Sequence, residues 1–330
     1  MGTRWTGIGL AIGAACAMGG AAPALKTLGG AGGLSAINII QARTAVGALA
    51  LLACTLVLRQ GRMRVHPRDW WLIAMYGGVS IAANQVVFTM SLSRLPVGVA
   101  LLLEYLAPVL VAGWVRLVRR QPVSGLVWVG AATTVLGLGL LGKVWSGFAL
   151  DGLGVGLGLL AAVTLAGRFL VVERGLRRYD PLVMAAWGTA AAAVATSAVA
   201  ALAAGAAAPF PVHVLTERVT LSGAVVPVFV LVAWVGLVGM AGGVLLGVTA
   251  QRLLPPTTAS LLLSLEVVAG SVLAYALLGE RLTGVQAAGA AIMLAGVLAV
   301  AAAKRAPAKP AVVGPAFDKR RALTHSGHQT

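Results

Sequence analysis

Two glutamates lie within long apolar runs of this 330-residue chain, where a carboxyl group is best placed to do chemistry. Glu104 follows the run Ala100–Leu103 and Glu266 follows Leu261–Leu265, whereas the other seven acidic residues lie in predicted loops, helix ends or the tail. A carboxylate inside a membrane is costly unless it is paired, neutral or hydrated. The pair therefore predicts contacts to a substrate ammonium group, a proton-coupling site or both. The alternative is a structural carboxylate neutralised by a neighbouring helix.

Arg43 is predicted at a depth similar to that of Glu104. Each lies about eight or nine residues from the same end of its apolar segment, or about 12–14 Å at the helical rise. An Arg43–Glu104 pair would be either a structural bridge or an ion pair that opens when a zwitterion binds. Arg168 is expected near the inner end of its segment, from which its side chain would extend to the lipid headgroups.

Neutral polar side chains near these charges would form hydrogen bonds either to a substrate or between helices. They are Asn38, Gln41, Asn84, Gln85 and Tyr105.

Proline and glycine predict local helix geometry. Pro108 follows Glu104 by one turn and removes a backbone hydrogen bond, so a helix bend is predicted there. Glycines spaced four residues apart, at 239, 243 and 247 and again at 152 and 156, predict close helix packing within one protomer.

The sequence offers no enzyme site. Gly137–Val144 resembles a phosphate-binding loop, but Val144 replaces the required Ser or Thr and no strand precedes it. The four histidines lie in loops or the tail without metal-type spacing, and the two cysteines lie in apolar runs. No nucleophile–base pair falls within the apolar segments. We therefore expect neither an enzyme nor a bound metal or cofactor.

The composition requires lipid as part of the solvent for the elements that carry these residues. Only 10% of the residues are charged, 59% are hydrophobic and the mean hydropathy is +0.94, whereas a soluble domain has about 25% charged residues. Apolar runs of about 20 residues predict membrane-spanning helices. We place ten of them at 5–24, 35–58, 70–91, 95–117, 123–142, 152–172, 183–205, 223–249, 255–278 and 283–303.

The distribution of positive charge predicts the orientation of these helices. With both termini cytoplasmic, 18 of the 25 lysines and arginines fall on the inner side and five on the outer side. The net charge of +16 thus follows membrane topology and does not indicate a nucleic-acid partner. We expect a multi-pass protein of the inner cell membrane. The basic tail 304–330 is expected to be a disordered cytoplasmic segment.

An internal repeat divides the ten helices into two halves. Residues 95–141 match 254–300 at an offset of 159, with Gly125, Gly130 and Gly137 falling on glycines. Near the start of each half, Gly7–Leu10 matches Gly154–Leu157 at an offset of 147. Because each half has five spans, the second would enter the membrane from the opposite side, as in many transporters. The predicted repeats are 1–147 and 148–303.

The sequence resembles the drug/metabolite transporter superfamily, specifically its ten-span EamA-type branch. The resemblance covers about residues 5–303 and rests on Arg94–Pro108 and on Leu278–Thr283 with Gln286 and Gly289. Gly19–Ala22, Lys26 and Arg43 look like the threonine/homoserine exporter subgroup. The chain departs from the pattern at Val267, where many relatives carry Pro, and at Gln121, where the first half often has an acidic residue.

The resemblance implies ion-coupled export of amino acids or related small metabolites through a central cavity, by alternating access. It implies that Glu104 and Glu266 face that cavity and that Glu280 ends the second repeat at the outer interface. The expected partners are a small-molecule substrate and the lipid bilayer, with the protein a monomer or homodimer. The alternatives are a drug or cation exporter of the same fold and a non-transporting membrane scaffold or accessory subunit.

Overall fold

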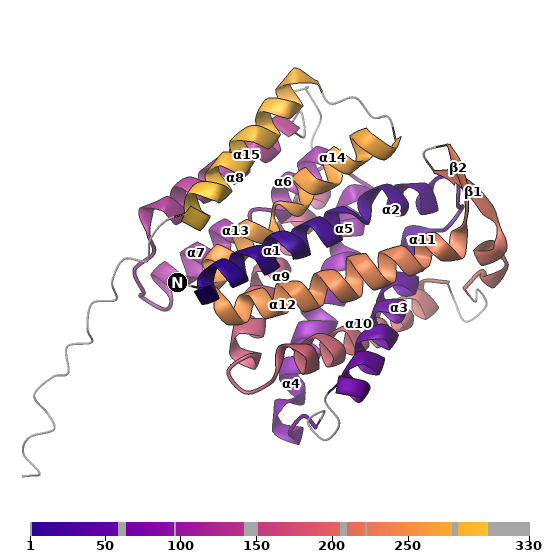
Figure 1. The fold of residues 1–330 in the computed structure, drawn as a ribbon, viewed down its shortest axis with the longest axis horizontal. Helices are drawn as coiled ribbons and strands as arrows, with labels where there is room; N and C mark the ends of the chain where they lie inside the picture. Colours follow the sequence, from indigo (N-terminus) through magenta and orange to yellow (C-terminus); the bar gives the residue numbers. More distant parts are fainter. Residues whose placement is uncertain are drawn as a thin grey trace, which may run out of the picture.

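The computed structural model describes residues 2–58, 64–95, 97–141, 151–204, 210–221, 223–278 and 283–302, which form a bundle of helices (Figure 1). Nine helical segments in these ranges are long and apolar enough to cross a membrane, and one shorter apolar helix, Gly125–Leu141, makes a tenth. The prediction of ten spans is therefore confirmed. The Ala-rich span predicted at 183–205 is a 24-residue helix.

The spans of the first half are built from several helical pieces. In chain order these are α1 (Gly2–Gly19), α2 (Ala22–Gly29), α3 (Ala36–Leu58), η1 (Pro67–Asp69), α4 (Trp70–Ile73), η2 (Ala74–Ala83), α5 (Asn84–Leu92), α6 (Val97–Glu104), α7 (Ala107–Leu117) and α8 (Gly125–Leu141).

The second half repeats this plan and adds a short hairpin. Its elements are α9 (Gly152–Gly175), α10 (Pro181–Ala204), η3 (Val212–Thr216), β1 (Arg218–Leu221), β2 (Ala224–Pro227), α11 (Val228–Trp234), η4 (Val235–Gly242), α12 (Gly243–Leu253), α13 (Pro256–Leu263), α14 (Glu266–Leu278) and α15 (Gly284–Ala302).

The eighth span begins five residues later than predicted, because residues 224–227 are a strand. β1 and β2 pair antiparallel, from Arg218 with Pro227 to Leu221 with Ala224. Gly223 has a φ of +79°, which a glycine adopts without strain at the turn. Valine-rich runs suit a strand as well as a helix, so apolar length alone did not separate the two.

Helix interruptions recur at equivalent positions in the two halves. α6 ends at Glu104 and α7 begins at Ala107, while α13 ends at Leu263 and α14 begins at Glu266. Both pairs of boundaries are related by the predicted offset of 159. The π-helical segments η2 and η4 also end at equivalent residues, Ala83 and Gly242. The boundary predicted at 147/148 and the tail 304–330 lie outside the described residues.

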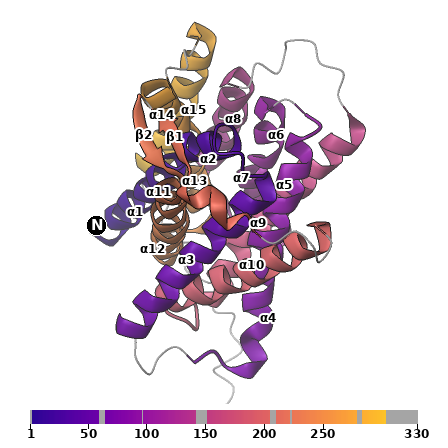
Figure 2. The same cartoon turned by 90° about the vertical axis from the view of Figure 1, so that its right-hand side faces the viewer.

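The last helices of the two halves, α8 and α15, lie side by side (Figures 1 and 2). A Cβ added to Gly137 would lie 2.6 Å from the carbonyl oxygen of Gly289, and one added to Gly289 would lie 2.6 Å from that of Gly137. Each of these glycines is thus required by the backbone of a helix from the other repeat. Where lipid removes the hydrophobic drive between helices, such close backbone packing holds them together.

The two glycine stripes have different outcomes. A Cβ on Gly239 or Gly243 would lie within 2.7 Å of Ala21 or Met18, so the first stripe packs closely within the protomer as predicted. The prediction for Gly152 and Gly156 is wrong, because a Cβ on either would meet no atom within 4 Å. Gly154 and Gly158 make close contacts on α9 instead, against Leu95 and Leu103. The spacing of the glycines alone did not predict which face of the helix packs against its neighbours.

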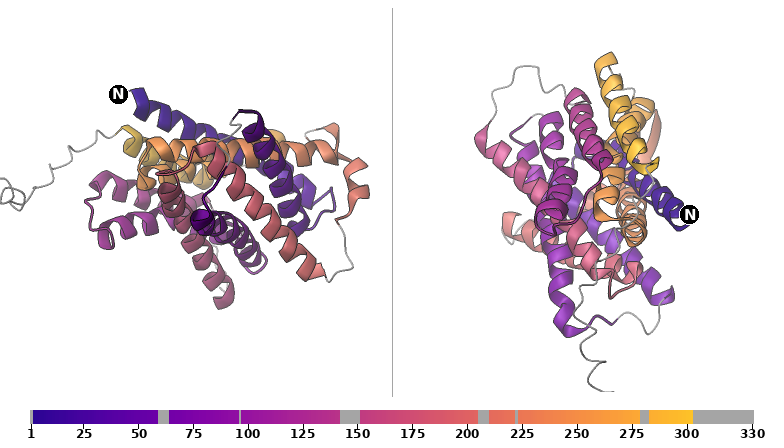
Figure 3. Two further views of the ribbon diagram at one scale, coloured as in Figure 1. Left: turned by 90° about the horizontal axis from the view of Figure 1, so that it is seen from below. Right: turned by 90° about the vertical axis from the view of Figure 1, so that its left-hand side faces the viewer.

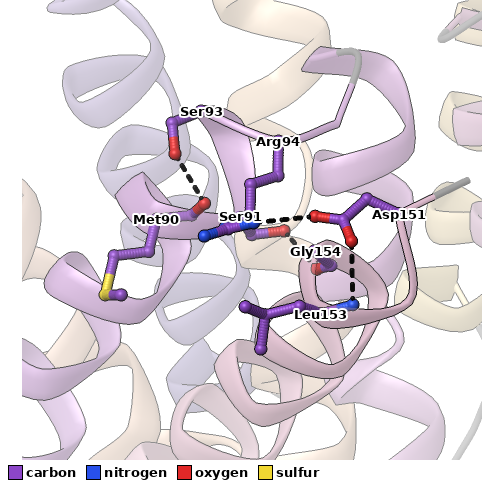
Figure 4. A network of polar contacts seen from close by, with 7 residues as sticks. All are labelled: Met90, Ser91, Ser93, Arg94, Asp151, Leu153 and Gly154. Atoms are coloured by element: carbon purple, nitrogen blue, oxygen red, sulfur yellow. Dashed lines mark hydrogen bonds and ion pairs between the residues drawn. The ribbon is translucent and has the colours of Figure 1, made fainter.

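The start of α1 and the β1–β2 hairpin lie at opposite ends of the bundle (Figures 1 and 3). The hairpin end also holds the start of α9, where the Asp151 carboxylate accepts a bond from the Leu153 N–H and pairs with Arg94 at 3.1 Å (Figure 4). At the opposite end of the bundle, η1 contacts the connection between α9 and α10. We call this the ion-pair end, after the contact that follows. There Arg178 pairs with Asp69 at 2.7 Å.

Candidate functional site

A cavity of about 1020 Å³ lies between the two repeats. Its charged lining residues are Lys26, Arg43, Glu104, Arg168 and Glu266. Residues of the hairpin end, such as those at 29, 35 and 278, also line it, so the cavity extends toward that end. Its volume matches that of sites which enclose a small molecule.

Glu104 lies at the C-terminal end of α6 and is held by Asn84, the first residue of α5. The Asn84 Nδ2 donates to Glu104 Oε1 at 3.3 Å, to the Ala161 carbonyl at 3.0 Å and to Thr164 Oγ1 at 3.1 Å. The glutamate is only 8% exposed. This amide therefore connects the buried carboxylate of the first repeat to α9 of the second.

Glu266 is the first residue of α14, directly after the interruption in that span. Its Oε1 accepts a hydrogen bond from the Tyr105 hydroxyl, which lies in the interruption between α6 and α7. The break in one repeat thus supplies the donor for the carboxylate of the other. Pro108, in the first turn of α7, has no N–H to offer the Glu104 carbonyl, and its ring leaves no room for an unbroken helix there.

Arg43 faces the cavity, but the structure does not form the predicted pair with Glu104. No ion pair between them is present among the described residues, and the buried Arg43 Nε has no hydrogen-bond partner. The charges that act on this guanidinium are, from strongest to weakest, those of Glu266, Arg168 and Glu104. Arg43 is therefore a member of a four-charge cluster rather than half of a bridge.

Arg168 corrects the sequence analysis, because its side chain lines the cavity rather than reaching the headgroups. Its Nε is buried without a partner. The predicted span ended at residue 172, whereas α9 continues to Gly175 and places Arg168 about 10 Å from its end at the helical rise. The depth of this charge within the apolar segment is the feature of the sequence that indicates a position in the cavity.

The neutral polar candidates divide into two groups. Asn84, Gln85 and Tyr105 line the cavity, as does Pro108. Asn38 and Gln41 are not in its lining, and the Gln41 amide instead donates to Ser197 Oγ at 3.4 Å, between α3 and α10. Gln41 thus contributes to helix association. Glu280 lies outside the described residues.

The comparisons with known proteins agree with this architecture. The model of the EamA-like transporter family matches the chain twice, over residues 5–142 and 152–302. The chain belongs to the EamA-like transporter family. Its EamA repeats correspond to the two halves described above, which confirms the two-repeat, ten-helix membrane fold. The family consists of transporters of the drug/metabolite type and not of enzymes.

A solved structure titled only "Crystal structure of protein" has the same fold. It aligns over 91% of this chain and 98% of its own with a TM-score of 0.68 and 16% identity. At that identity the likeness concerns the fold alone. No curated protein matches the chain. The resemblance to the threonine/homoserine exporter subgroup therefore stays a prediction.

Proposed function

We propose that this EamA-family protein is a secondary transporter of the inner cell membrane that exports amino acids or related small metabolites, with ion coupling. The observation that carries the proposal is the cavity between the repeats, into which each repeat contributes one arginine and one glutamate. A zwitterion carries the two charges that such a cluster complements. This charge pattern supports an amino-acid substrate over a cationic drug.

In this proposal Glu266 is the principal contact for the substrate ammonium group or the coupling proton. Its carboxylate faces the cavity, is repelled by Glu104 and is attracted by Arg43. A carboxyl group between like and opposite charges can exchange a proton or a cation for its neighbours as the cavity fills. Glu104 serves the same function from a more enclosed position.

Alternating access would move the cavity opening from the hairpin end to the ion-pair end. With both termini cytoplasmic, the hairpin end is the outer side. The ion pair Arg178–Asp69, at 2.7 Å, then joins the two repeats on the inner side in this conformation. Opening inward requires this contact to separate, as when one repeat rocks against the other.

Counterflow in proteoliposomes tests the proposal. The full chain is reconstituted and exchange is measured for a panel of labelled amino acids, sugars and cationic drugs. We expect exchange of one or more amino acids and its loss in Glu266→Gln. The matched control is Glu217→Gln, because Glu217 is exposed in the loop before β1, away from the cavity.

The possible results separate the alternatives. Exchange of cationic drugs without amino acids would replace the proposal with a drug exporter. A folded protein that exchanges none of these solutes would favour a scaffold or accessory subunit. Unchanged flux in Glu266→Gln would remove Glu266 from the mechanism.

A further inference from the structure

The glutamates and the arginines of the cavity differ in how fully they are hydrogen-bonded. Both carboxylates have a donor, since Asn84 donates to Glu104 and Tyr105 donates to Glu266. By contrast, the Nε of Arg43 and the Nε of Arg168 are both buried and have no hydrogen-bond partner among the described residues. Among the described basic groups of the site, the buried N–H groups without a partner therefore belong to its two arginines.

An unpartnered guanidinium in a protein interior is costly. Arginine has five N–H donors and no acceptor, and each buried donor without an acceptor loses its hydration without replacement. The Tyr76 hydroxyl lies next to the Arg168 guanidinium and is an acceptor within its reach. It is a neutral group, however, and does not balance the charge of Arg168.

The two arginines also act on each other as like charges. They come from different repeats, Arg43 from α3 and Arg168 from α9, and both line the same cavity. An oxyanion between them would accept from both guanidinium groups and offset their repulsion. Arginine is the residue best suited to this contact, because its planar fork binds a carboxylate through two parallel bonds.

We propose that Arg43 and Arg168 form the subsite for the carboxylate of the transported solute. This inference rests on the proposed function, since the ligand is the solute that the cavity carries. It goes further in assigning the acidic group to the arginines and the ammonium group to the glutamates. Two arginines and two glutamates offer a partner of opposite charge to each charged group of a zwitterion.

The substrate consequence is that the acidic group is required for transport. An amino acid and its carboxamide differ only in that charge, so the wild-type protein should prefer the acid. A lost charged hydrogen bond corresponds to about 10- to 100-fold in apparent affinity. Counterflow with each of the twenty amino acids and its carboxamide measures this preference directly.

Arg168→Gln should remove the preference rather than the transport. We expect the apparent KM for the accepted amino acid to rise about 10- to 100-fold, while the carboxamide is carried as well as before. Arg168→Lys keeps the charge but not the two parallel bonds and should fall between. The control is Arg218→Gln, since Arg218 is exposed in β1. Thermal unfolding of each purified variant checks its folding.

The outcomes for this subsite and for the proposed function differ. If the wild-type protein carries carboxamides or amines as readily as amino acids, transport stands and the carboxylate subsite is wrong. Equal losses for acid and amide in folded Arg168→Gln would likewise assign Arg168 a structural role. If the wild-type protein exchanges no solute of the panel, the proposed function fails and the subsite fails with it. The wild-type comparison needs no variant to fold.

Discussion

The two interrupted spans, α6–α7 and α13–α14, break at equivalent residues but carry their glutamates on opposite sides of the break. Glu104 is the last residue before the first interruption, and Glu266 is the first residue after the second. A carboxylate is favoured at a helix N-terminus and disfavoured at a C-terminus. Glu266 thus gains from its own helix, whereas Glu104 relies on Asn84. The two repeats thus share the position of the helix interruption but differ in where the glutamate lies relative to it.

The hydrogen-bond donor to Glu266 is the clearest difference between the two interruptions, and we expect its removal to have the largest effect on transport. Tyr105 and Ser264 are equivalent by the offset of 159, but the Tyr105 hydroxyl reaches the other repeat while Ser264 Oγ donates to the Leu261 carbonyl of its own helix at 2.7 Å. We expect Tyr105→Phe to lower counterflow about tenfold, because a hydrogen bond to a charged group is lost. Ser264→Ala should leave the rate nearly unchanged.

Initial rates of counterflow at equal protein density check this pair of variants. Similar rates for Tyr105→Phe and the wild type would show that the contact to Glu266 is not used in transport. A large loss in Ser264→Ala would show that the two interruptions are functionally alike.

Proline at the break gives a smaller effect, on stability. The first interruption has Pro108, whereas Val267 takes its place in the second and its N–H donates to the Ser264 carbonyl at 3.2 Å. Val267→Pro loses one weak bond in the first turn of α14, where proline is tolerated, so the cost should be about 1 kcal/mol. Pro108→Ala should also be mild, since the second break persists without proline.

Thermal unfolding in detergent measures both variants, with Val272→Pro in the middle of α14 as the destabilising reference. Val267→Pro unfolding as early as that reference would mean that residue 267 is not in the first turn of its helix. Severe unfolding of Pro108→Ala would mean that proline, and not the packing of the repeats, imposes the first break.

The interrupted spans α6–α7 and α13–α14 show which features of the fold and the site can be predicted from the sequence. Apolar length and the repeated glycines gave the ten helices and their division, and burial cost singled out Glu104 and Glu266. Pro108 marked the first interruption, but nothing in the sequence around Ser264 marks the second, because tertiary packing produces it. The Tyr105–Glu266 contact and the inward position of Arg168 depend on which helix faces meet, and hydropathy does not encode that.

Equivalent glycine–leucine contacts occur at the hairpin end and at the ion-pair end, but the residues beside them differ. A Cβ on Gly154 would lie 2.8 Å from Leu95 Cγ, and one on Gly7 would lie 2.9 Å from the equivalent Leu254 Cγ. Beside the first contact is the ion pair of Arg94 with Asp151 (Figure 4). Leu253 occupies the position equivalent to Arg94. The same packing is thus supported by charge in one repeat and by apolar contact in the other.

Removing this ion pair should have the smallest effect, and it should depend on pH. The hydrogen bond from Arg94 lowers the pKa of the Asp151 carboxyl below its ordinary value. Its stabilisation is therefore complete above about pH 4, the unfolded value, and is lost as the pH falls through the lower folded value. Asp151→Asn keeps an oxygen for the Leu153 N–H and removes only the charge.

Melting temperatures of the wild type and Asp151→Asn should accordingly differ slightly at pH 7 and converge as the pH falls below 4. Both partners are about two-fifths exposed, and exposed pairs contribute little. Arg94→Leu, which copies Leu253 of the other repeat, should give the same small loss, and the double variant should add nothing further. A pH-independent difference for Asp151→Asn would instead show that the carboxylate charge is not the source of the stabilisation, and the two repeats would then not differ through this ion pair.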